Sequence, residues 1–308
     1  MPRMTDPRTL VGPIIGKQSG MVRVAFDSGP TRLMADVPVN ELWVEVKDVL
    51  VFEEYEYLPS FRLSNLQVGS TVVDVGAYAG TYSLKSSPFA SRVIAFEPSR
   101  RNIQLLRRNL NLNASKNIEA RQVALSSRAG YVAFPDLETG TSFSAVHGAA
   151  STPSSYQVPS ISMDDLTDEI GVVDLMKMDI EGMEYDAILA ASSSTLRKVR
   201  RLVAEIHLPS ASSIALLGRT VAHLKKAGKE VTVVRSAVGK PLAGLLKPWA
   251  CSLVGFEQGS SLLFKAYLSA VYGFPLSMKL VSVFDVGTTG LLFAKDQGLG
   301  PGATRLQP

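Results

Sequence analysis

The middle of the chain alternates continuous apolar runs with helical patterns, and this alternation limits the fold more than any other feature of the sequence. Strands are expected at 71–75, 92–96, 118–124, 174–178, 201–206 and 230–234, and the helical patterns lie at 78–86, 99–113, 184–192 and 213–227. Buried strands that alternate with amphipathic helices are typical of a parallel sheet covered on both faces. The sequence therefore predicts an α/β fold with a doubly wound, mostly parallel sheet.

The N-terminal part is predicted to add a hairpin and short helices to this sheet. Residues 21–26 and 31–37 have strand character, and the residues between them, Asp-Ser-Gly-Pro at 27–30, form a turn signal. A short helix is expected within 41–52. We therefore expect residues 1–69 to form an N-terminal extension that packs on the core.

The core domain is expected to cover residues 70–295 and to carry two inserted segments. Residues 128–160 are rich in Ser, Gly, Thr and Ala and predict a long loop or lid, and 236–279 is the second insertion. Late strands are expected at 279–284 and 290–294, where an antiparallel direction is considered. Residues 296–308 are predicted to be a frayed tail.

Composition favours a cytoplasmic protein with a buried core. Hydrophobic residues make up 46% of the 308 residues, and 32 basic residues face 28 acidic ones, an excess that permits an anionic partner without predicting one. No signal-peptide core is visible in 1–12, and the apolar stretch 249–275 is interrupted by Glu257 and Lys265, so no membrane span is expected. One cysteine and three scattered histidines predict no disulfide framework and no metal site.

The sharpest local motif is Val-Val-Asp-Val-Gly-Ala-Tyr-Ala-Gly at 72–80. A buried strand carries Asp74 near its end, and Gly76 and Gly80 then open the following helix. Glycines permit a tight turn and a close ligand approach, and ligands of open α/β sheets bind at the carboxyl ends of strands. A dinucleotide fingerprint would need glycine at position 78, where this chain has Tyr78. An acid before the turn suits a cation, and S-adenosylmethionine carries a sulfonium and an ammonium but no phosphate.

A second acid ends the next strand. Glu97 follows the glycine turn by about 20 residues, where dinucleotide-binding folds place an acid that accepts hydrogen bonds from ribose hydroxyls. This feature fits NAD as well as S-adenosylmethionine. The plainer interpretations are an ordinary tight turn at 76–80 and a solvated strand end at Glu97. The strand, the turn and the spaced acid together favour a nucleoside site.

A third group of acids follows the strand at 174–178. Asp179, Glu181 and Glu184 are expected to face the same crevice as the glycine turn. A carboxylate there can take the proton of an acceptor hydroxyl, orient it, or hold the ammonium of the cofactor. The alternative is a helix N-terminus whose acids complement the helix dipole, and we favour it for Glu184.

The strand at 201–206 is followed by a candidate base. Strand alternation places Glu205 and His207 on one side of the sheet. His207 could take the acceptor's proton because its ordinary pKa is near neutral, whereas a histidine at a strand end is otherwise simply hydrogen-bonded.

Together these motifs resemble the FkbM family of S-adenosylmethionine-dependent methyltransferases over about residues 52–207. The matching stretches are 73–77 with Gly80, 94–98, 109–113, 124–126, 162–166, 177–184 and 205–207. The glycine turn is shared by many methyltransferases, whereas Asp-Ile-Glu-Gly at 179–182 with Glu-Ile-His at 205–207 is much more specific. The resemblance implies a seven-stranded methyltransferase fold and O-methylation of a sugar or another small hydroxylated compound.

The resemblance also implies a set of site residues. The cofactor contacts would come from Asp74, Gly76, Ala77, Tyr78, Gly80 and Glu97, with Ala124 and Leu125 near the adenine. Tyr78 departs from the family, which often has asparagine there. The catalytic candidates are His207, Asp179 and Glu181. Acceptor choice is expected to depend on 16–66 and 236–279, which have no clear family counterpart.

Three rival functions remain open from the sequence. An RNA methyltransferase would use the basic runs at 100–108 and 197–201, although such runs are usually solvated helix faces and no aromatic RNA-binding module accompanies them. An NAD-dependent oxidoreductase is disfavoured by Tyr78 in the glycine turn. A non-catalytic binding module would keep the turn without needing Asp179, Glu181 and His207. We favour a small-molecule or glycan acceptor over a nucleic acid.

Overall fold

The computed structural model describes residues 20–39, 41, 45, 49–50, 53–135, 155–207, 211–235 and 289–297. Most of the helix expected within 41–52, the insertion at 236–279, the strand expected at 279–284 and residues 298–308 of the expected tail lie outside this part of the chain. Among the described helices, none is long and apolar enough to cross a membrane.

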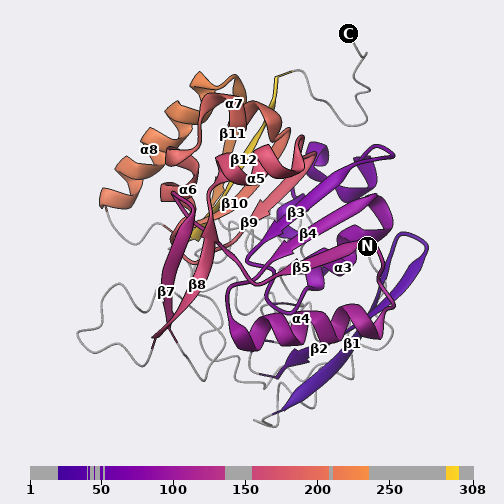
Figure 1. Ribbon diagram of the computed structural model, residues 1–308. Coiled ribbons are helices and arrows are strands. Elements are labelled where there is room, and N and C mark those ends of the chain that lie inside the picture. Colours follow the sequence, from indigo (N-terminus) through magenta and orange to yellow (C-terminus); the bar gives the residue numbers. More distant parts are fainter. Residues whose placement is uncertain are drawn as a thin grey trace, which may run out of the picture.

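The predicted doubly wound, seven-stranded sheet is confirmed. Its strands are β3 (Thr71–Val75), β4 (Arg92–Phe96), β5 (Ile118–Arg121), β9 (Leu175–Met178), β10 (Arg201–His207), β11 (Lys229–Arg235) and β12 (Thr289–Asp296). Their order is β11-β12-β10-β9-β3-β4-β5 (Figure 1). The strands β3, β4, β5, β9 and β10 pair with their neighbours in parallel, whereas β12 runs antiparallel to β10 and to β11. The late strand expected at 290–294 is therefore present and antiparallel.

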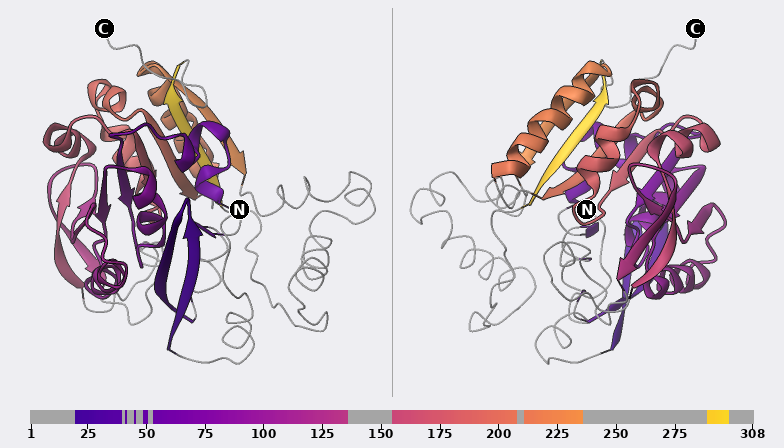
Figure 2. Two further views of the ribbon diagram at one scale, coloured as in Figure 1. Left: turned by 90° about the vertical axis from the view of Figure 1, so that its right-hand side faces the viewer. Right: turned by 60° about the vertical axis from the view of Figure 1, so that its left-hand side comes forward.

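Helices cover both faces of this sheet (Figure 2). Successive side chains of a strand point to opposite faces, so Val72 packs in one core and Val73 in the other. The first core contains residues of α3 (Thr81–Ser86) and α4 (Arg100–Leu112) and of the short 3-10 turns η3 (Pro59–Phe61) and η4 (Leu63–Asn65). The second contains residues of α5 (Met163–Ile170), α6 (Glu184–Ala190), α7 (Ser193–Lys198) and α8 (Ala211–Lys226).

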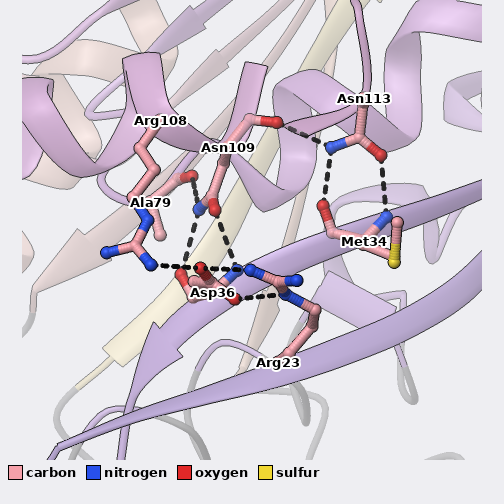
Figure 3. A network of polar contacts seen from close by, with 7 residues as sticks. All are labelled: Arg23, Met34, Asp36, Ala79, Arg108, Asn109 and Asn113. Atoms are coloured by element: carbon pink, nitrogen blue, oxygen red, sulfur yellow. Dashed lines mark hydrogen bonds and ion pairs between the residues drawn. The ribbon is translucent and has the colours of Figure 1, made fainter. Parts of the chain in front are cut away.

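The expected N-terminal hairpin is present and is fastened to α4 by two asparagines. It consists of β1 (Met21–Ser28) and β2 (Thr31–Pro38), paired antiparallel. The Asn109 side-chain amide accepts a hydrogen bond from Asp36 N at 2.8 Å and donates to Asp36 O at 3.0 Å and to Ala79 O at 2.8 Å. The Asn113 amide accepts from Met34 N at 2.8 Å and donates to Met34 O at 2.6 Å (Figure 3). Two side chains thus take the place of a third strand beside β2, and Asn109 also reaches the turn after β3.

We expect Asn109→Ala to lower the free energy of unfolding by about 3 kcal/mol, because it removes three hydrogen bonds at a fully buried position and leaves backbone groups of β2 and the turn without these partners. Urea denaturation followed by circular dichroism measures this change. Asn111→Ala is the matched control, since Asn111 lies on the same helix and is exposed. Equal stability of the two variants would contradict the role given to Asn109.

The segment 128–160, expected to be a loop or lid, has strands at both ends. β7 (Gly130–Pro135) and β8 (Ser155–Ile161) form a three-stranded sheet with β6 (Ala124–Leu125), in the order β6-β8-β7. The expected strand at 118–124 accordingly ends at Arg121. Buried Val158 and Ser160 alternate with exposed residues in β8, and this half-buried alternation is hard to see in a Ser- and Gly-rich segment.

Two predicted boundaries are also wrong. The helix expected from residue 78 begins at Thr81, because Tyr78 and Gly80 have positive φ angles of 48° and 83°, which a right-handed helix excludes. Asp296, expected to begin the tail, is the last residue of β12, and its carboxylate lies 2.7 Å from the Lys229 ammonium.

Candidate functional site

A cavity lies at the carboxyl ends of β3, β4 and β9, where the strand order changes direction. From β3 the chain continues to β4 on one side, and β9 lies on the other side. Such a switch point is where open α/β sheets bind ligands. The cavity contains about 1040 Å³ of empty space, including the solvent at its mouth, and is lined by Glu41, Glu45, Val75, Gly76, Tyr78, Phe96, Glu97, Pro98, Asn102, Val123, Ala124, Leu125, Ser126, Val132, Phe134, Asp179, Ile180, Glu181 and Met183.

The structure brings most of the predicted site residues to this cavity. Gly76, Tyr78, Glu97, Ala124, Leu125, Asp179 and Glu181 all line it. Among the described residues, the lining does not include Asp74, Ala77 or Gly80. His207 is the last residue of β10 and pairs with Thr289, and its side chain lies outside the described part.

The two glycines of the turn are required by neighbouring protein atoms. Gly76 has a φ of 76°, and a Cβ there would lie 1.7 Å from the main-chain oxygen of Asp179. A Cβ on Gly80 would lie 2.2 Å from Leu106 Cδ1. From the sequence, these glycines were expected to permit a tight turn and a close ligand approach. The structure shows that β9 and α4 also approach the turn closely.

Asp74 lies behind the cavity. Strand alternation turns its side chain toward α3, where Ser83 Oγ donates a hydrogen bond to Oδ2 at 2.6 Å. Its Oδ1 lies 3.4 Å from the ammonium of Lys177, and the residue is fully buried. These contacts give Asp74 a supporting role under the turn, and its predicted contact with a cofactor stays a prediction.

The carboxylate of Glu97 agrees best with its predicted role, which is to accept hydrogen bonds from ribose hydroxyls. Its Oε2 accepts a hydrogen bond from Tyr78 N at 2.8 Å, and its Oε1 accepts from Ser99 N at 2.9 Å and from Asn102 Nδ2 at 3.4 Å. Burial raises the pKa of Glu97 to about 7, against the opposing effect of these hydrogen bonds. A fixed, partly desolvated carboxyl group at the end of β4 suits the hydroxyls of a ribose.

Two further acids line the cavity and were missed from the sequence. Glu41 and Glu45 follow β2, and burial raises the pKa of Glu45 to about 8 although the nearby charge of Lys177 favours its ionised form. Residues four apart lie on one face of a helix, so the spacing of Glu41 and Glu45 was the signal that the sequence offered for this pair.

An apolar wall completes the cavity on the side of the small sheet. It consists of Val123, Ala124, Leu125, Val132 and Phe134, from β6 and β7 and the residue before β6. Ala124 and Leu125 were predicted to lie near an adenine, whereas Val132 and Phe134 were hidden in the segment expected to be a loop. A flat aromatic base fits such a surface.

The loop after β9 is held by Glu184. Its Oε1 accepts a hydrogen bond from Ile180 N at 2.8 Å, and its Oε2 accepts from Gly182 N at 2.9 Å. Glu181 between them has a φ of 56°, and burial raises the pKa of Glu184 to about 8. Glu184 does lie in the first turn of α6, as the dipole interpretation requires, but its carboxylate also fixes the loop that carries Asp179 and Glu181.

Lys177 lies among the carboxylates around the turn, and its place in the site was not predicted from the sequence. Its ammonium donates to Gly76 O at 2.7 Å and lies 3.4 Å from Asp74 Oδ1 and 3.6 Å from Asp179 Oδ2. Burial acts to lower the pKa of Lys177, but the carboxylates of Asp74, Asp179, Glu45 and Glu205 outweigh it and raise the pKa above its usual value. A lysine within a continuously buried strand was the signal in the sequence.

Within the described ranges, no group of three or more His, Cys, Asp or Glu side chains is placed to hold a metal ion. The acids that line the cavity come from the segment after β2 and from the residues that follow β4 and β9.

Comparison with known proteins identifies a matching family. The family described as "Methyltransferase FkbM domain" matches residues 74–231 of the 308. No curated protein matches the sequence significantly.

The structure also has remote likenesses among solved structures. A SAM-dependent methyltransferase from Agrobacterium tumefaciens is 11% identical with a TM-score of 0.46, covering 91% of this chain and 71% of that one. An rRNA methylase from Streptococcus thermophilus is 11% identical with a TM-score of 0.40, covering 76% and 90%. A Streptococcus mutans protein in complex with SAH is 10% identical with a TM-score of 0.36, covering 75% and 92%. The fold assignment therefore rests on the strand order itself.

Proposed function

Since the chain belongs to the FkbM methyltransferase domain family, we propose that it is an S-adenosylmethionine-dependent methyltransferase whose cofactor occupies the cavity at the ends of β3, β4 and β9. The observation that carries this assignment is the charge of the lining. The described lining residues include five acids, Glu41, Glu45, Glu97, Asp179 and Glu181, and no lysine, arginine or histidine. Such a site favours a sulfonium and an ammonium, and it disfavours the pyrophosphate of NAD.

The parts of the cofactor can be assigned to parts of the cavity. The adenine would pack on the apolar wall that contains Ala124 and Leu125, and the ribose hydroxyls would donate to Glu97. The methionine part would lie beside the turn at Gly76 and Tyr78, near the carboxylates on the opposite side of the cavity. S-adenosylmethionine, when bound, supplies an activated methyl group on a cationic sulfur.

The protein's main contribution to methyl transfer would be positioning. An in-line displacement needs donor and acceptor at near-attack distance, and removal of the acceptor's proton comes second. Asp179 and Glu181 line the cavity and are our candidates for orienting and deprotonating a hydroxyl. His207 remains a third candidate because it lies at the end of β10. We propose O-methylation of a sugar or another small hydroxylated compound.

The basic runs do not require an RNA acceptor. Several of their side chains have structural partners: Arg100 lies over the Tyr156 ring at 4.0 Å, Arg108 pairs with Asp36 at 3.1 Å, Lys198 with Asp168 at 2.6 Å and Arg200 with Asp174 at 2.5 Å. The acidic cavity lining also opposes an approaching phosphate. Both observations favour an acceptor without a nucleic-acid backbone.

We expect the affinity for S-adenosylmethionine to fall as the pH decreases through about 7. Ribose hydroxyls donate to the ionised form of Glu97, and burial places the pKa of this group at about 7, so protonation removes an acceptor below that pH. Calorimetric titration between about pH 5.5 and 8.5, about 1.5 units to either side of this pKa, measures the effect. Glu97→Gln should bind about tenfold more weakly at pH 8 and should lose most of the pH dependence.

Glu119→Gln is the control for this titration, because Glu119 is an exposed acid that pairs with Arg92 and Arg121 away from the cavity. It should retain both the affinity and the pH dependence. If Glu97→Gln behaves like Glu119→Gln, the ribose is not bound by Glu97. Methylation itself is tested by incubating the protein with methyl-labelled cofactor and candidate sugars, followed by mass spectrometry.

A further inference from the structure

One side chain from outside the family-matched region contacts the catalytic candidate Asp179. Tyr55 belongs to the 3-10 turn η2 (Glu54–Glu56) and precedes residues 74–231. Its hydroxyl lies 2.9 Å from Asp179 Oδ2, to which it donates, and 3.3 Å from Glu205 Oε2. The Tyr55 hydroxyl group thus lies between the carboxylate of Asp179, which follows β9, and that of Glu205 within β10 (Arg201–His207).

Tyr55 is itself held in a fixed position. Its side chain is buried, and its ring meets the Tyr82 ring edge-on at a centroid distance of 5.5 Å. The Lys177 ammonium lies 5.2 Å from the centre of the Tyr55 ring, within the range of a cation–π contact. A rigid ring with few accessible rotamers can hold its hydroxyl group at a defined point with little loss of entropy.

The same oxygen of Asp179 is approached by one hydrogen-bond donor and one cation. Oδ2 accepts from Tyr55 and lies 3.6 Å from the Lys177 ammonium. The Asp179 side chain is nevertheless 26% exposed and lines the cavity. With Oδ2 turned toward Tyr55 and Lys177, the carboxylate of Asp179 has a defined orientation at the cavity.

We propose that Tyr55 is a positioning residue that aims Asp179 at the point of methyl transfer. This inference rests on the proposed function. In the transfer step, the acceptor's O–H bond breaks and its proton forms a new bond to Asp179 Oδ1. The acceptor oxygen bonds to the methyl carbon, and the electron pair of the breaking carbon–sulfur bond remains on sulfur, which gives neutral S-adenosylhomocysteine. Atoms and charges balance without any further reactant.

The test uses two ligands that differ at the transfer point. S-adenosylhomocysteine has a neutral sulfur there, whereas sinefungin, an amine analogue of the cofactor, has an ammonium in the place of the methyl group. A carboxylate aimed at this point should bind sinefungin more tightly. We expect the wild-type protein to prefer sinefungin about tenfold or more, in line with a hydrogen bond to a charged group.

Tyr55→Phe should reduce this preference to about twofold or less while it changes the affinity for S-adenosylhomocysteine by less than about twofold. Asp179→Asn should remove the preference for sinefungin as well. The preference of the double variant should equal that of Asp179→Asn alone, because both changes act on one interaction. Tyr57→Phe is the control, since it removes a hydroxyl from a neighbouring, partly buried tyrosine. Thermal unfolding of each variant identifies any loss of fold.

Each outcome separates this inference from the proposed function. Absence of S-adenosylhomocysteine binding in the wild-type protein would overturn the proposed function itself. Binding without a preference for sinefungin, or an undiminished preference in folded Tyr55→Phe, would overturn the role of Tyr55 alone. If Asp179→Asn loses affinity equally for both ligands, Asp179 binds another part of the cofactor, and this would also overturn the inference. If Tyr55→Phe does not fold, the double-mutant comparison is replaced by Asp179→Asn with Glu205→Gln, of which only the first should remove the preference.

Discussion

Replacing Gly76 with alanine should lower the free energy of unfolding by more than about 4 kcal/mol and should leave little folded protein. Two costs add at this position. A left-handed φ of 76° costs a residue with a Cβ about 1–2 kcal/mol. The new Cβ would also lie 1.7 Å from Asp179 O and 2.8 Å from Asp179 C, and these are main-chain atoms that cannot rotate away.

The clash has nowhere to relax, because the chain of Asp179 is held in the sheet. Asp179 N donates to Val75 O at 3.0 Å, so β9 cannot move without breaking its pairing with β3. Gly69→Ala is the matched control, since Gly69 has a φ of 91° and nothing within 4 Å of its Cβ position. Urea denaturation of both variants separates the cost of the backbone angle from the cost of the clash. A Gly76→Ala variant within about 1 kcal/mol of Gly69→Ala would contradict this account of the turn.

Replacing Lys177 with methionine should be almost as damaging. Methionine has a similar length but no charge, so Asp74 and Asp179 would lose the ammonium that lies 3.4 Å and 3.6 Å from them. Removing one partner of a buried charge pair costs about 3–5 kcal/mol, because the remaining charge stays buried. We expect a loss of this size at pH 8, measured by urea denaturation.

The loss from Lys177→Met should shrink as the pH falls. The pKa of Glu45, near Lys177, is raised to about 8 and that of Glu97 to about 7, so these carboxyls become neutral below these values and no longer need a nearby cation. For such groups the folded-state pKa lies above the unfolded value of 4.5, so their contribution to stability is fully present below 4.5 and is lost as the pH rises from there to about 7 for Glu97 and about 8 for Glu45.

Lys198→Met is the control for Lys177→Met. Lys198 also pairs with an aspartate, Asp168, at 2.6 Å, but both side chains are exposed, and surface pairs contribute less than about 1 kcal/mol. A loss at Lys177 no larger than the loss at Lys198 would show that the buried ammonium does not stabilise the site.

The fold could be predicted because its signals are local. Continuous apolar runs such as 71–75 and 92–96 can only be buried on both faces, and each is followed by a helical pattern. Six of the seven strands of the main sheet were placed by this alternation, and β12 was expected separately as a late strand at 290–294. The small sheet of β6, β7 and β8 was missed because its strands are half-buried and lie in a segment whose composition is typical of loops.

The cavity lining was easiest to predict where a residue follows a strand directly. Glu97 and Asp179 come at the ends of β4 and β9, so their place at the cavity follows from the topology. Asp74 lies within its strand, and alternation turned it to the other face, a point that the motif alone did not reveal. Tyr55 and Glu45 reach the site from the N-terminal extension, and no local pattern encodes a contact across more than a hundred residues, such as that between Tyr55 and Asp179.

The central claim is that the acidic cavity at the ends of β3, β4 and β9 binds S-adenosylmethionine. Isothermal titration calorimetry of the full chain at pH 8 with S-adenosylmethionine, and separately with NAD, tests it most directly. We predict saturable binding of one S-adenosylmethionine per chain, weakened about tenfold by Glu97→Gln, and no saturable binding of NAD. Saturable binding of NAD with none of S-adenosylmethionine would contradict the claim.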